Sequence, residues 1–138
     1  MKVSLLYFGR PRDRAANQMA QEYARRIGRY CDFQMRQVRD GKALQAQQRA
    51  YKVVLDPSGR RFTSAELAGL VAKAENGGLR ELVFLLGGAD GVGPEARQSA
   101  QLLLSLSPMT LPHELARVVL AEQIYRAFTI LRHHPYPR

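Results

Sequence analysis

The 138-residue chain is 46% hydrophobic and 24% charged, which places it among ordinary globular proteins and predicts one domain spanning residues 1–138. Its only cysteine, Cys31, excludes an intrachain disulfide and a cysteine-based metal site, and no apolar run is long enough to cross a membrane. The net charge of +9, of which residues 1–50 carry +7, favours a polyanionic partner such as RNA or DNA, although a solvated basic surface would have the same composition.

A strand and a helix are predicted near the N-terminus. Val3–Phe8 is apolar and stops at Gly9, as a buried strand does, and it is too short for a signal-peptide core, so we expect a cytoplasmic protein. The segment from Arg12 to about Ile27 is rich in helix-forming residues and predicts a helix that ends at Gly28. Its buried face should contain Ala16, Met19, Tyr23 and Ile27.

Two strands are predicted in the middle of the chain. The alternation in Asp32–Val38 indicates a strand, and the polar residues 41–49 indicate a loop or a short helical turn. Tyr51–Leu55 predicts a buried strand. It should end at Asp56-Pro57-Ser58-Gly59, because these residue types are typical of tight turns.

Helices and strands then alternate. Thr63 and Glu66 have the spacing of a capping box, which predicts a helix that ends at Asn76-Gly77-Gly78. Glu81–Leu86 predicts a buried strand. Proline suits the first turn of a helix, so a further helix is predicted over Pro94–Leu104.

The last predicted helix runs from about Glu114 to Leu131. Glu122 and Arg126 should form an ion pair on it, because residues four apart are neighbours on a helix surface. Apolar strands that alternate with helices indicate an α/β domain with a largely parallel sheet. The inward-facing residues of this helix should be Leu115, Val118, Val119, Tyr125 and Phe128.

Glycine follows two of the predicted strands. Leu55 leads into Asp56-Pro57-Ser58-Gly59, and Leu86 leads into Gly87-Gly88. Ligands of open parallel sheets bind outside the carboxyl ends of the strands, and glycine allows a ligand to approach the backbone. Either loop alone would favour an ordinary tight turn, whereas the two loops together are as typical of one ligand site as of two turns.

One glycine pattern suggests a different ligand. Gly91-Val92-Gly93-Pro94-Glu95-Ala96 fits the Gly-x-Gly-x-x-Ala pattern of dinucleotide-binding proteins. That fingerprint begins in the first turn after its strand, whereas here four residues, 87–90, separate it from the strand. A dinucleotide-dependent enzyme is therefore a competing hypothesis that rests on this pattern alone.

The histidines and the C-terminal tail are the remaining candidates for chemistry. His113, His133 and His134 lack the spacing of a metal site, so we expect no metal, and His113 alone would be a surface or capping residue. Tyr136 and Arg138 would be part of a frayed terminus, but two nearby prolines indicate instead a stiff tail that docks.

Several segments together carry a family resemblance that covers almost the whole chain. They are Val54-Leu55-Asp56 with Gly59, Leu86-Gly87-Gly88-Ala89-Asp90-Gly91, the segment from Leu106 to His113, the segment from Arg117 to Ala127, and His134-Pro135-Tyr136. In these segments the chain resembles the RlmH (YbeA-like) family of SPOUT-class RNA methyltransferases.

The resemblance implies a fold, a cofactor and a substrate. The fold would be a SPOUT-type parallel sheet with helices on both faces and a C-terminal trefoil knot. The protein would work as a homodimer that uses S-adenosylmethionine to methylate N3 of a pseudouridine in large-subunit ribosomal RNA. Carried over by position, the cofactor contacts would be Leu55, Gly87, Leu106, Ser107, Pro108, Met109, Thr110 and Leu111. The hypothesis for the catalytic residues is His113, Tyr136 and Arg138.

The chain departs from the family pattern at three places. Pro137 replaces a histidine of the family tail, Pro108 stands where the family commonly has lysine, and the segment between Val38 and Tyr51 is short, as if a helix were missing. The change at Pro137 and the short middle segment leave open a second interpretation, a ribosome- or RNA-binding SPOUT relative without catalytic activity.

Overall fold

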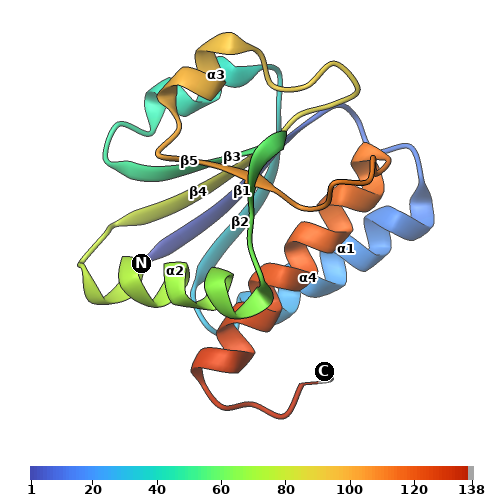
Figure 1. Cartoon of the computed structure of the whole chain (residues 1–138). Coiled ribbons are helices and arrows are strands. Elements are labelled where there is room, and N and C mark those ends of the chain that lie inside the picture. The colour runs from blue at the N-terminus through green and yellow to red at the C-terminus, as the bar shows by residue number, and fades with distance from the viewer. Residues whose placement is uncertain (137–138) are drawn as a thin grey trace.

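A sheet of five parallel strands forms the centre of the molecule, in the order β2-β1-β4-β3-β5 (Figure 1). The computed structural model describes residues 1–136. The strands are β1 (Lys2–Phe8), β2 (Asp32–Val38), β3 (Ala50–Arg61), β4 (Glu81–Leu86) and β5 (Leu102–Ser105).

Helices cover both faces of the sheet (Figure 1). One face carries α1 (Arg14–Ile27), α2 (Ser64–Asn76) and α4 (His113–Leu131), with α4 packed against the other two. The opposite face carries the 3-10 helix η1 (Gly41–Ala46) and α3 (Pro94–Ser99). The predicted α/β class, with a parallel sheet and helices on both faces, is confirmed.

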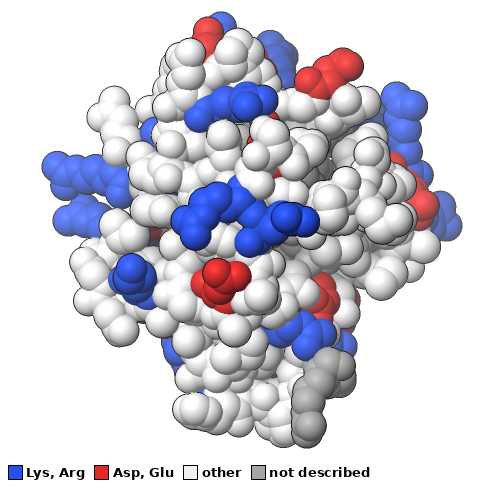
Figure 2. All heavy atoms as spheres, viewed as in Figure 1, with Lys and Arg blue, Asp and Glu red and all other residues white. Residues whose placement is uncertain are grey.

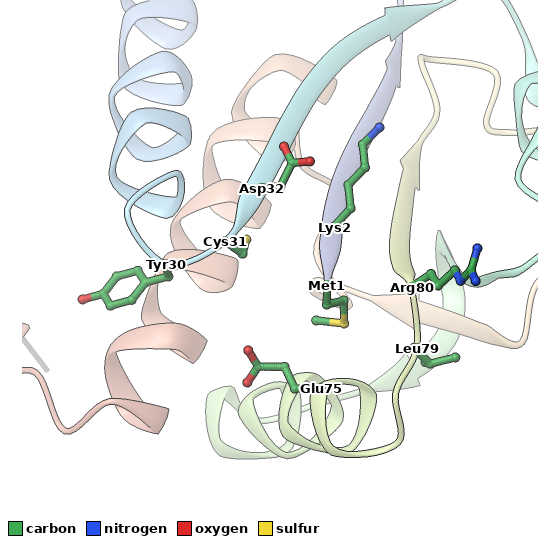
Figure 3. A pocket seen from close by; sticks show the side chains of 8 residues that line it. All are labelled: Met1, Lys2, Tyr30, Cys31, Asp32, Glu75, Leu79 and Arg80. Atoms are coloured by element: carbon green, nitrogen blue, oxygen red, sulfur yellow. The ribbon is translucent and has the colours of Figure 1, made fainter.

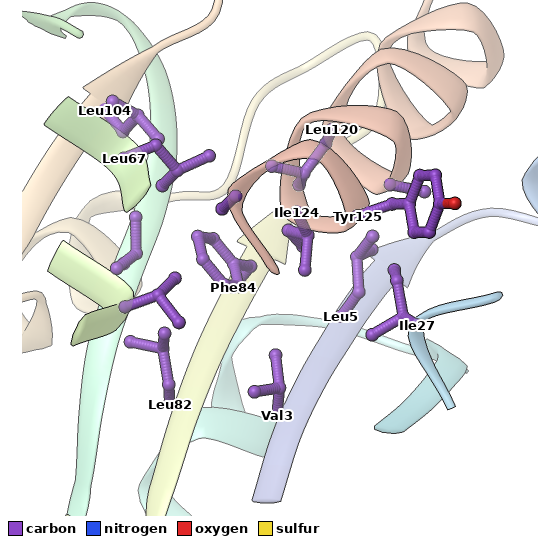
Figure 4. Packing of buried hydrophobic residues seen from close by; sticks show 14 of the residues in the cluster. Val3, Leu5, Ile27, Leu67, Leu82, Phe84, Leu104, Leu120, Ile124 and Tyr125 are labelled. Atoms are coloured by element: carbon purple, nitrogen blue, oxygen red, sulfur yellow. The ribbon is translucent and has the colours of Figure 1, made fainter. Parts of the chain in front are cut away.

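The two faces of the sheet belong to two hydrophobic cores, as the alternation of side chains along β4 demonstrates. Leu82, Phe84 and Leu86 join the larger core under α1, α2 and α4, whereas Val83 and Leu85 join the smaller one under η1 and α3. Figure 4 shows Phe84 packed beneath Leu120 and Ile124 of α4. Because both of its faces are buried, β4 is apolar from Leu82 to Leu86.

Side chains cap the N-termini of α1 and α2, close to where the sequence predicts that these helices begin. The capping box of α2 is formed: Thr63 Oγ1 accepts a hydrogen bond from the Glu66 amide at 3.1 Å, and Glu66 accepts one from the Thr63 amide at 2.8 Å. Asp13 caps α1 by accepting a hydrogen bond from the amide of Ala16 at 3.0 Å. The predicted pair on α4 is also present, with Arg126 Nη2 2.7 Å from a carboxylate oxygen of Glu122.

The predicted helix over Pro94–Leu104 is wrong in its second half. α3 ends at Ser99, and Leu102–Ser105 forms strand β5, which pairs in parallel with β3. The short apolar run suits a helix and a strand equally well, and its long-range pairing with β3 decides for the strand.

The predicted end of the strand at Leu55 is also wrong. β3 continues to Arg61, and its pairing with β5 shifts register between Leu55 and Arg60. Asp56 Oδ1 accepts hydrogen bonds from the amide and the hydroxyl of Ser58, at 2.8 and 2.6 Å. The turn-forming residues therefore make a bulge inside a long strand, not a turn after a short one.

The predicted inward faces of α1 and α4 need correction at three positions. Met19 is 50% exposed, Leu115 is 47% exposed and Val119 is 37% exposed. α1 packs on α4 through Ala16 and Ala20 against Val118, so the three exposed side chains lie outside this contact. α4 has other buried residues instead, because it lies on the sheet and between two helices; they include Leu120, Ala121 and Ile124.

A buried arginine ties α4 to three other elements. Arg117 is 2% exposed, and its Nη2 donates to the Asn17 side-chain oxygen of α1 at 2.9 Å. Its guanidinium carbon lies 4.3 Å from the centre of the Tyr7 ring, and Nη1 is 3.9 Å from the Met35 sulfur. These neutral partners join α4, α1, β1 and β2 around one cation.

The bulge in β3 gives a prediction about Gly59. A Cβ atom at Gly59 would lie 2.6 Å from the backbone carbon and oxygen of Leu103, and backbone cannot move aside easily. Gly59→Ala should therefore lower the free energy of unfolding by about 2 kcal/mol, measured by urea denaturation. The matched control is Gly69→Ala on α2, where a Cβ meets nothing within 4 Å and helix propensity should slightly raise stability. Equal stabilities of the two variants would contradict the prediction.

Candidate functional site

A pocket of about 420 Å³ lies at the carboxyl ends of β4 and β5 and at the bulge of β3, close to where the sequence predicts a ligand site. Three segments form its walls: the bulge of β3, the glycine loop after β4, and the loop between β5 and α4. The volume is within the range of pockets that bind cofactor-sized ligands. Its lining residues are Leu55–Pro57, Leu86–Ala89, Gly91, Leu104–His113 and Ala116.

The structure brings together all eight residues to which the resemblance carries cofactor contacts, as well as one predicted catalytic residue. Leu55, Gly87 and the whole run from Leu106 to Leu111 line this pocket, and His113 stands at its edge as the first residue of α4. The sequence assigned no individual role to Asp56, Ser105 or Ala116, which also line it. The Asp-Pro-Ser-Gly sequence around Asp56 could have indicated its place in the pocket. Ser105 and Ala116 line the pocket because of where β5 and α4 lie in the fold, which no local pattern indicates.

The glycine loop after β4 folds back on itself. Gly88 and Gly91 form an isolated bridge, and the amide of Gly91 donates to the carbonyl of Gly88 at 3.0 Å. A Cβ at Gly87 would lie 2.5 Å from the backbone of Gly91 and 2.9 Å from a Val92 methyl carbon. Glycine is therefore required at Gly87 by the close approach of the chain, and the backbone faces the pocket without a side chain.

The loop between β5 and α4 is held by hydroxyl groups. Ser105 Oγ donates to the carbonyl of Ser107 at 3.1 Å, and Ser107 Oγ accepts from the amide of Met109 at 2.9 Å. Pro108 and Pro112 restrict the backbone on either side of Met109, whose side chain is 76% exposed. The loop thus offers a pre-shaped wall with backbone donors and acceptors.

Among residues 1–136, Asp56 is the one carboxylate side chain that lines the pocket, and its charge is paired. Arg97 Nη1 of α3 lies 2.9 Å from Asp56 Oδ2, and the Asp56 side chain is 8% exposed. The hydrogen bond from the Ser58 hydroxyl, the amide of Ser58 and the charge of Arg97 together hold the pKa of Asp56 below its usual value.

The first turn of α4 is anchored to the segment before α1. Glu114 Oε1 accepts hydrogen bonds from the amides of Arg12 and Asp13, at 2.7 and 3.0 Å. The bonds from the Asp13 and Arg12 amides lower the pKa of Glu114. They fix the position of the neighbouring His113 at the edge of the pocket.

Tyr136 lies away from the pocket. Its hydroxyl donates to Glu122 Oε2 at 3.0 Å and is 3.3 Å from the Tyr23 hydroxyl, and its ring packs edge-on against Tyr125 at 4.6 Å. Burial, Tyr23 and Glu122 raise the pKa of Tyr136 well above the usual value. Tyr136 is therefore a hydrogen-bond donor at neutral pH and a poor proton acceptor.

His113 and Tyr136 are not brought together within one chain. Glu122, the partner of Tyr136, is about 13 Å further along α4 than His113 and on the opposite side of the helix. The third predicted catalytic residue, Arg138, and the substituted Pro137 lie outside the described residues. The predicted catalytic set is thus split between two places.

A second hollow, of about 520 Å³, lies at the amino ends of β1, β2 and β4 (Figure 3). Lys2 and Arg80 line it together with Asp32 and Glu75, so its charges are mixed. Burial raises the pKa of Cys31 to about 11, so the thiol is protonated at neutral pH and is a poor nucleophile or metal ligand. This edge of a parallel sheet is also opposite to the edge where ligands bind.

Metal sites, membrane spans and a dinucleotide fingerprint lack support in the described part of the chain. Within residues 1–136, no three His, Cys, Asp or Glu side chains are grouped so as to hold a metal ion, and no helix there is long and apolar enough to cross a membrane. The Gly91–Ala96 pattern belongs to the start of α3, a helix of six residues whose N-cap is Gly93. It does not form the first turn after a strand, as a dinucleotide fingerprint must.

Comparisons with known proteins agree along the whole chain. A family model described as "Predicted SPOUT methyltransferase" matches residues 1–137. The ribosomal RNA large subunit methyltransferase H of Solibacter usitatus is 48% identical over 140 residues, with all of both chains covered. The protein of the same name from Thermus thermophilus is 43% identical over 139 residues, covering 100% of this chain and 99% of the relative.

A solved structure shares the fold at low sequence identity. It is described as a probable methylase family protein from Haemophilus influenzae Rd KW20, with a TM-score of 0.60 and 13% identity. The match covers 99% of this chain and 70% of that one.

The environment of Tyr136 gives a prediction about Glu122. Glu122→Gln removes the carboxylate that faces the phenol, so the pKa of Tyr136 should fall towards its usual value, and the stability should decrease by about 1 kcal/mol. NMR titration of ring-labelled tyrosine would measure the pKa. Because the folded pKa is raised, the contribution of Tyr136 to stability is fully present below its unfolded pKa of about 10 and is lost as the pH rises above that value. Glu95→Gln on α3 is the control, and an unchanged Tyr136 titration in Glu122→Gln would contradict the contact.

Proposed function

The chain belongs to the SPOUT methyltransferase family, and on that premise we propose that it transfers the methyl group of S-adenosylmethionine to N3 of a pseudouridine in large-subunit ribosomal RNA. The observation that carries this proposal is the pocket between the bulge of β3 and the carboxyl ends of β4 and β5. Its lining contains the eight residues from Leu55 to Leu111 to which the family resemblance assigns the cofactor. Relatives that carry the name ribosomal RNA large subunit methyltransferase H support the substrate class.

The residues of the pocket fit the methyl donor. Leu55, Leu104 and Leu106 give the pocket apolar surface for a ring system, and the backbone of residues 106–111 supplies donors and acceptors for its polar edge. Gly87, where a side chain would collide with Gly91, leaves the loop backbone open to a ligand. When bound, the sulfonium cofactor supplies an activated methyl group.

The residues of the chain would orient the acceptor and handle its proton. Methyl transfer requires the acceptor nitrogen in line with the methyl carbon, in a place from which water is excluded, and N3 of pseudouridine must lose its proton. We propose that His113, at the edge of the pocket, and the tail residues Tyr136 and Arg138 contribute to this step. Because Tyr136 remains protonated, it would donate a hydrogen bond and stabilise developing charge, and it would not accept the proton.

A homodimer would unite the two separated parts of the catalytic set. In one chain, Tyr136 packs beside Glu122 and Tyr125, away from His113. Three apolar side chains, those of Met19, Leu115 and Val119, are exposed on α1 and α4. A second copy on this surface would cover it and bring its tail towards the pocket of the first.

A ribosomal RNA partner agrees with the charge around the pocket. Figure 2 shows that basic side chains outnumber acidic ones in the middle of the face viewed. Arg60 and Arg61 are exposed at the end of β3, where they pair with Leu104 and Ser105, two residues that line the pocket. Their guanidinium groups could bind phosphates of an RNA whose base enters the site.

Three further assignments belong to the same proposal. The chain after β5 would complete the trefoil knot of the family, since the loop of residues 106–112 shares one pocket with the segments after Leu55 and Leu86. Residues 1–138 would form one domain, and the protein would act in the cytoplasm, where ribosomes are.

A non-catalytic RNA-binding role is the second candidate function, because Pro137 replaces the histidine of the family tail.

Methylation of ribosomes tests the proposal. The protein should transfer labelled methyl groups from S-adenosylmethionine to the large-subunit RNA of ribosomes that lack the modification, measured by scintillation and mapped by mass spectrometry. Binding of the cofactor without any transfer would favour the non-catalytic candidate. Absence of cofactor binding in calorimetry, with clear binding of a dinucleotide, would contradict the proposed cofactor and the reaction with it.

A mixing experiment tests the shared site. His113→Ala and Tyr136→Ala should each be inactive as homodimers. After the two variants are mixed and exchange subunits, half of the dimers have one intact site, so activity should return to about one quarter of the wild-type value. Failure to regain activity, with subunit exchange verified by mass spectrometry, would show that the two residues act within one chain. An active homodimer of either variant would show that its residue has no catalytic role.

A further inference from the structure

The carboxylate of Asp56 holds one wall of the pocket by contacts on both of its oxygens. Oδ1 accepts from the amide and the hydroxyl of Ser58, at 2.8 and 2.6 Å, which shapes the bulge of β3. Oδ2 lies 2.9 Å from Arg97 Nη1. The side chain is 8% exposed, so these contacts are largely protected from competition with water.

Arg97 comes from the segment that continues from another wall. It lies on α3, which follows the glycine loop of residues 87–91, and α3 also packs on η1. Its side chain is 47% exposed, so the aliphatic part contributes little to the core and the terminal guanidinium makes the contact. The ion pair therefore joins the bulge of β3 to the chain that continues from β4, and it does so beside the pocket.

The pair also removes an unwanted charge. Asp56 lines the pocket, and an unpaired carboxylate there would attract the positive sulfonium of the donor into the wrong position. With Arg97 in place, the pocket presents an approximately neutral, preshaped wall, which suits a ligand that must be held by shape.

We propose that Asp56 is a positioning residue for the methyl-donor pocket, and that its ion pair with Arg97 sets the spacing between the walls after β3 and β4. The inference rests on the proposed function, since the ligand of the pocket is taken to be S-adenosylmethionine. Asp56 acts through the backbone of Leu55, its neighbour in the chain, and of Ser58, whose amide it binds, and it does not itself contact the methyl group.

Affinities for two ligands distinguish positioning from direct attraction. S-adenosylmethionine carries a positive sulfonium, whereas S-adenosylhomocysteine has nearly the same shape and a neutral sulfur. If the pair positions the walls, Asp56→Asn and Arg97→Gln should each raise the Kd for both ligands by a similar factor of about ten. The Kd of the double variant should be no higher than that of the single variant with the higher Kd, because either change alone already breaks the contact.

Three results would overturn the inference. Arg97→Gln could leave the Kd for S-adenosylhomocysteine unchanged and lower the Kd for S-adenosylmethionine, which would mean that Asp56 attracts the sulfonium directly. Both variants could bind both ligands as the wild type does, or their effects could add fully in the double variant. If the wild-type protein binds neither ligand, the proposed function fails, and this inference with it.

Matched variants separate this role from loss of fold. Lys73→Gln on α2 removes a positive charge outside the pocket lining, and Glu95→Gln changes α3 without removing either member of the pair, so both should bind as the wild type does. Arg97→Gln keeps the hydrogen bonds of Ser58 and should unfold within a few degrees of the wild type. Loss of affinity in that variant at an unchanged melting temperature is the expected result.

Discussion

The interrupted pairing between β3 and β5 is the constraint on which the site depends. β3 pairs with β5 at Leu55, bulges, and resumes the pairing at Arg60, so one long strand serves both as a central strand and as the start of a pocket wall. The bulge can approach β5 closely because Gly59 lies against the backbone of Leu103, where a side chain would not fit. Since β5 leads directly into the loop of residues 106–112, the geometry of this pairing also sets the position of the third wall.

Two buried charges are stabilised in opposite ways. Arg117 is buried among neutral partners, the Tyr7 ring, the Asn17 amide and the Met35 sulfur, and its charge is spread over several weak contacts. Asp56 has a cation as partner and its second oxygen satisfied by Ser58. The first arrangement fastens four elements of the scaffold, whereas the second lies in the pocket wall, where an unpaired charge would act on a charged ligand.

The helix α4 explains why two of the proposed catalytic residues, His113 and Tyr136, do not meet within one chain. Its first turn carries His113 to the pocket, and its later turns bind Tyr136 through Glu122 and Tyr125 on the opposite side. A straight helix keeps these places apart, so no rotamer change can unite them. A tail that docks away from its own pocket, on a helix that also exposes apolar side chains, agrees with the proposed site shared between two copies.

Local patterns in the sequence determined the elements whose signals are local. The apolar runs of β1 and β4, the capping box at Thr63 and the glycines after Leu86 each depend on neighbouring residues, and family motifs spread over the chain indicated the pocket residues. Long-range contacts decided the rest. Leu102–Ser105 forms a strand because β3 lies beside it, and Asp56 meets Arg97 through the fold of α3. Met19 and Val119 are exposed because other residues of the two helices, Ala16, Ala20 and Val118, form the contact between α1 and α4. None of these outcomes has a signal within a few residues of the position concerned, so only the tertiary structure could determine them.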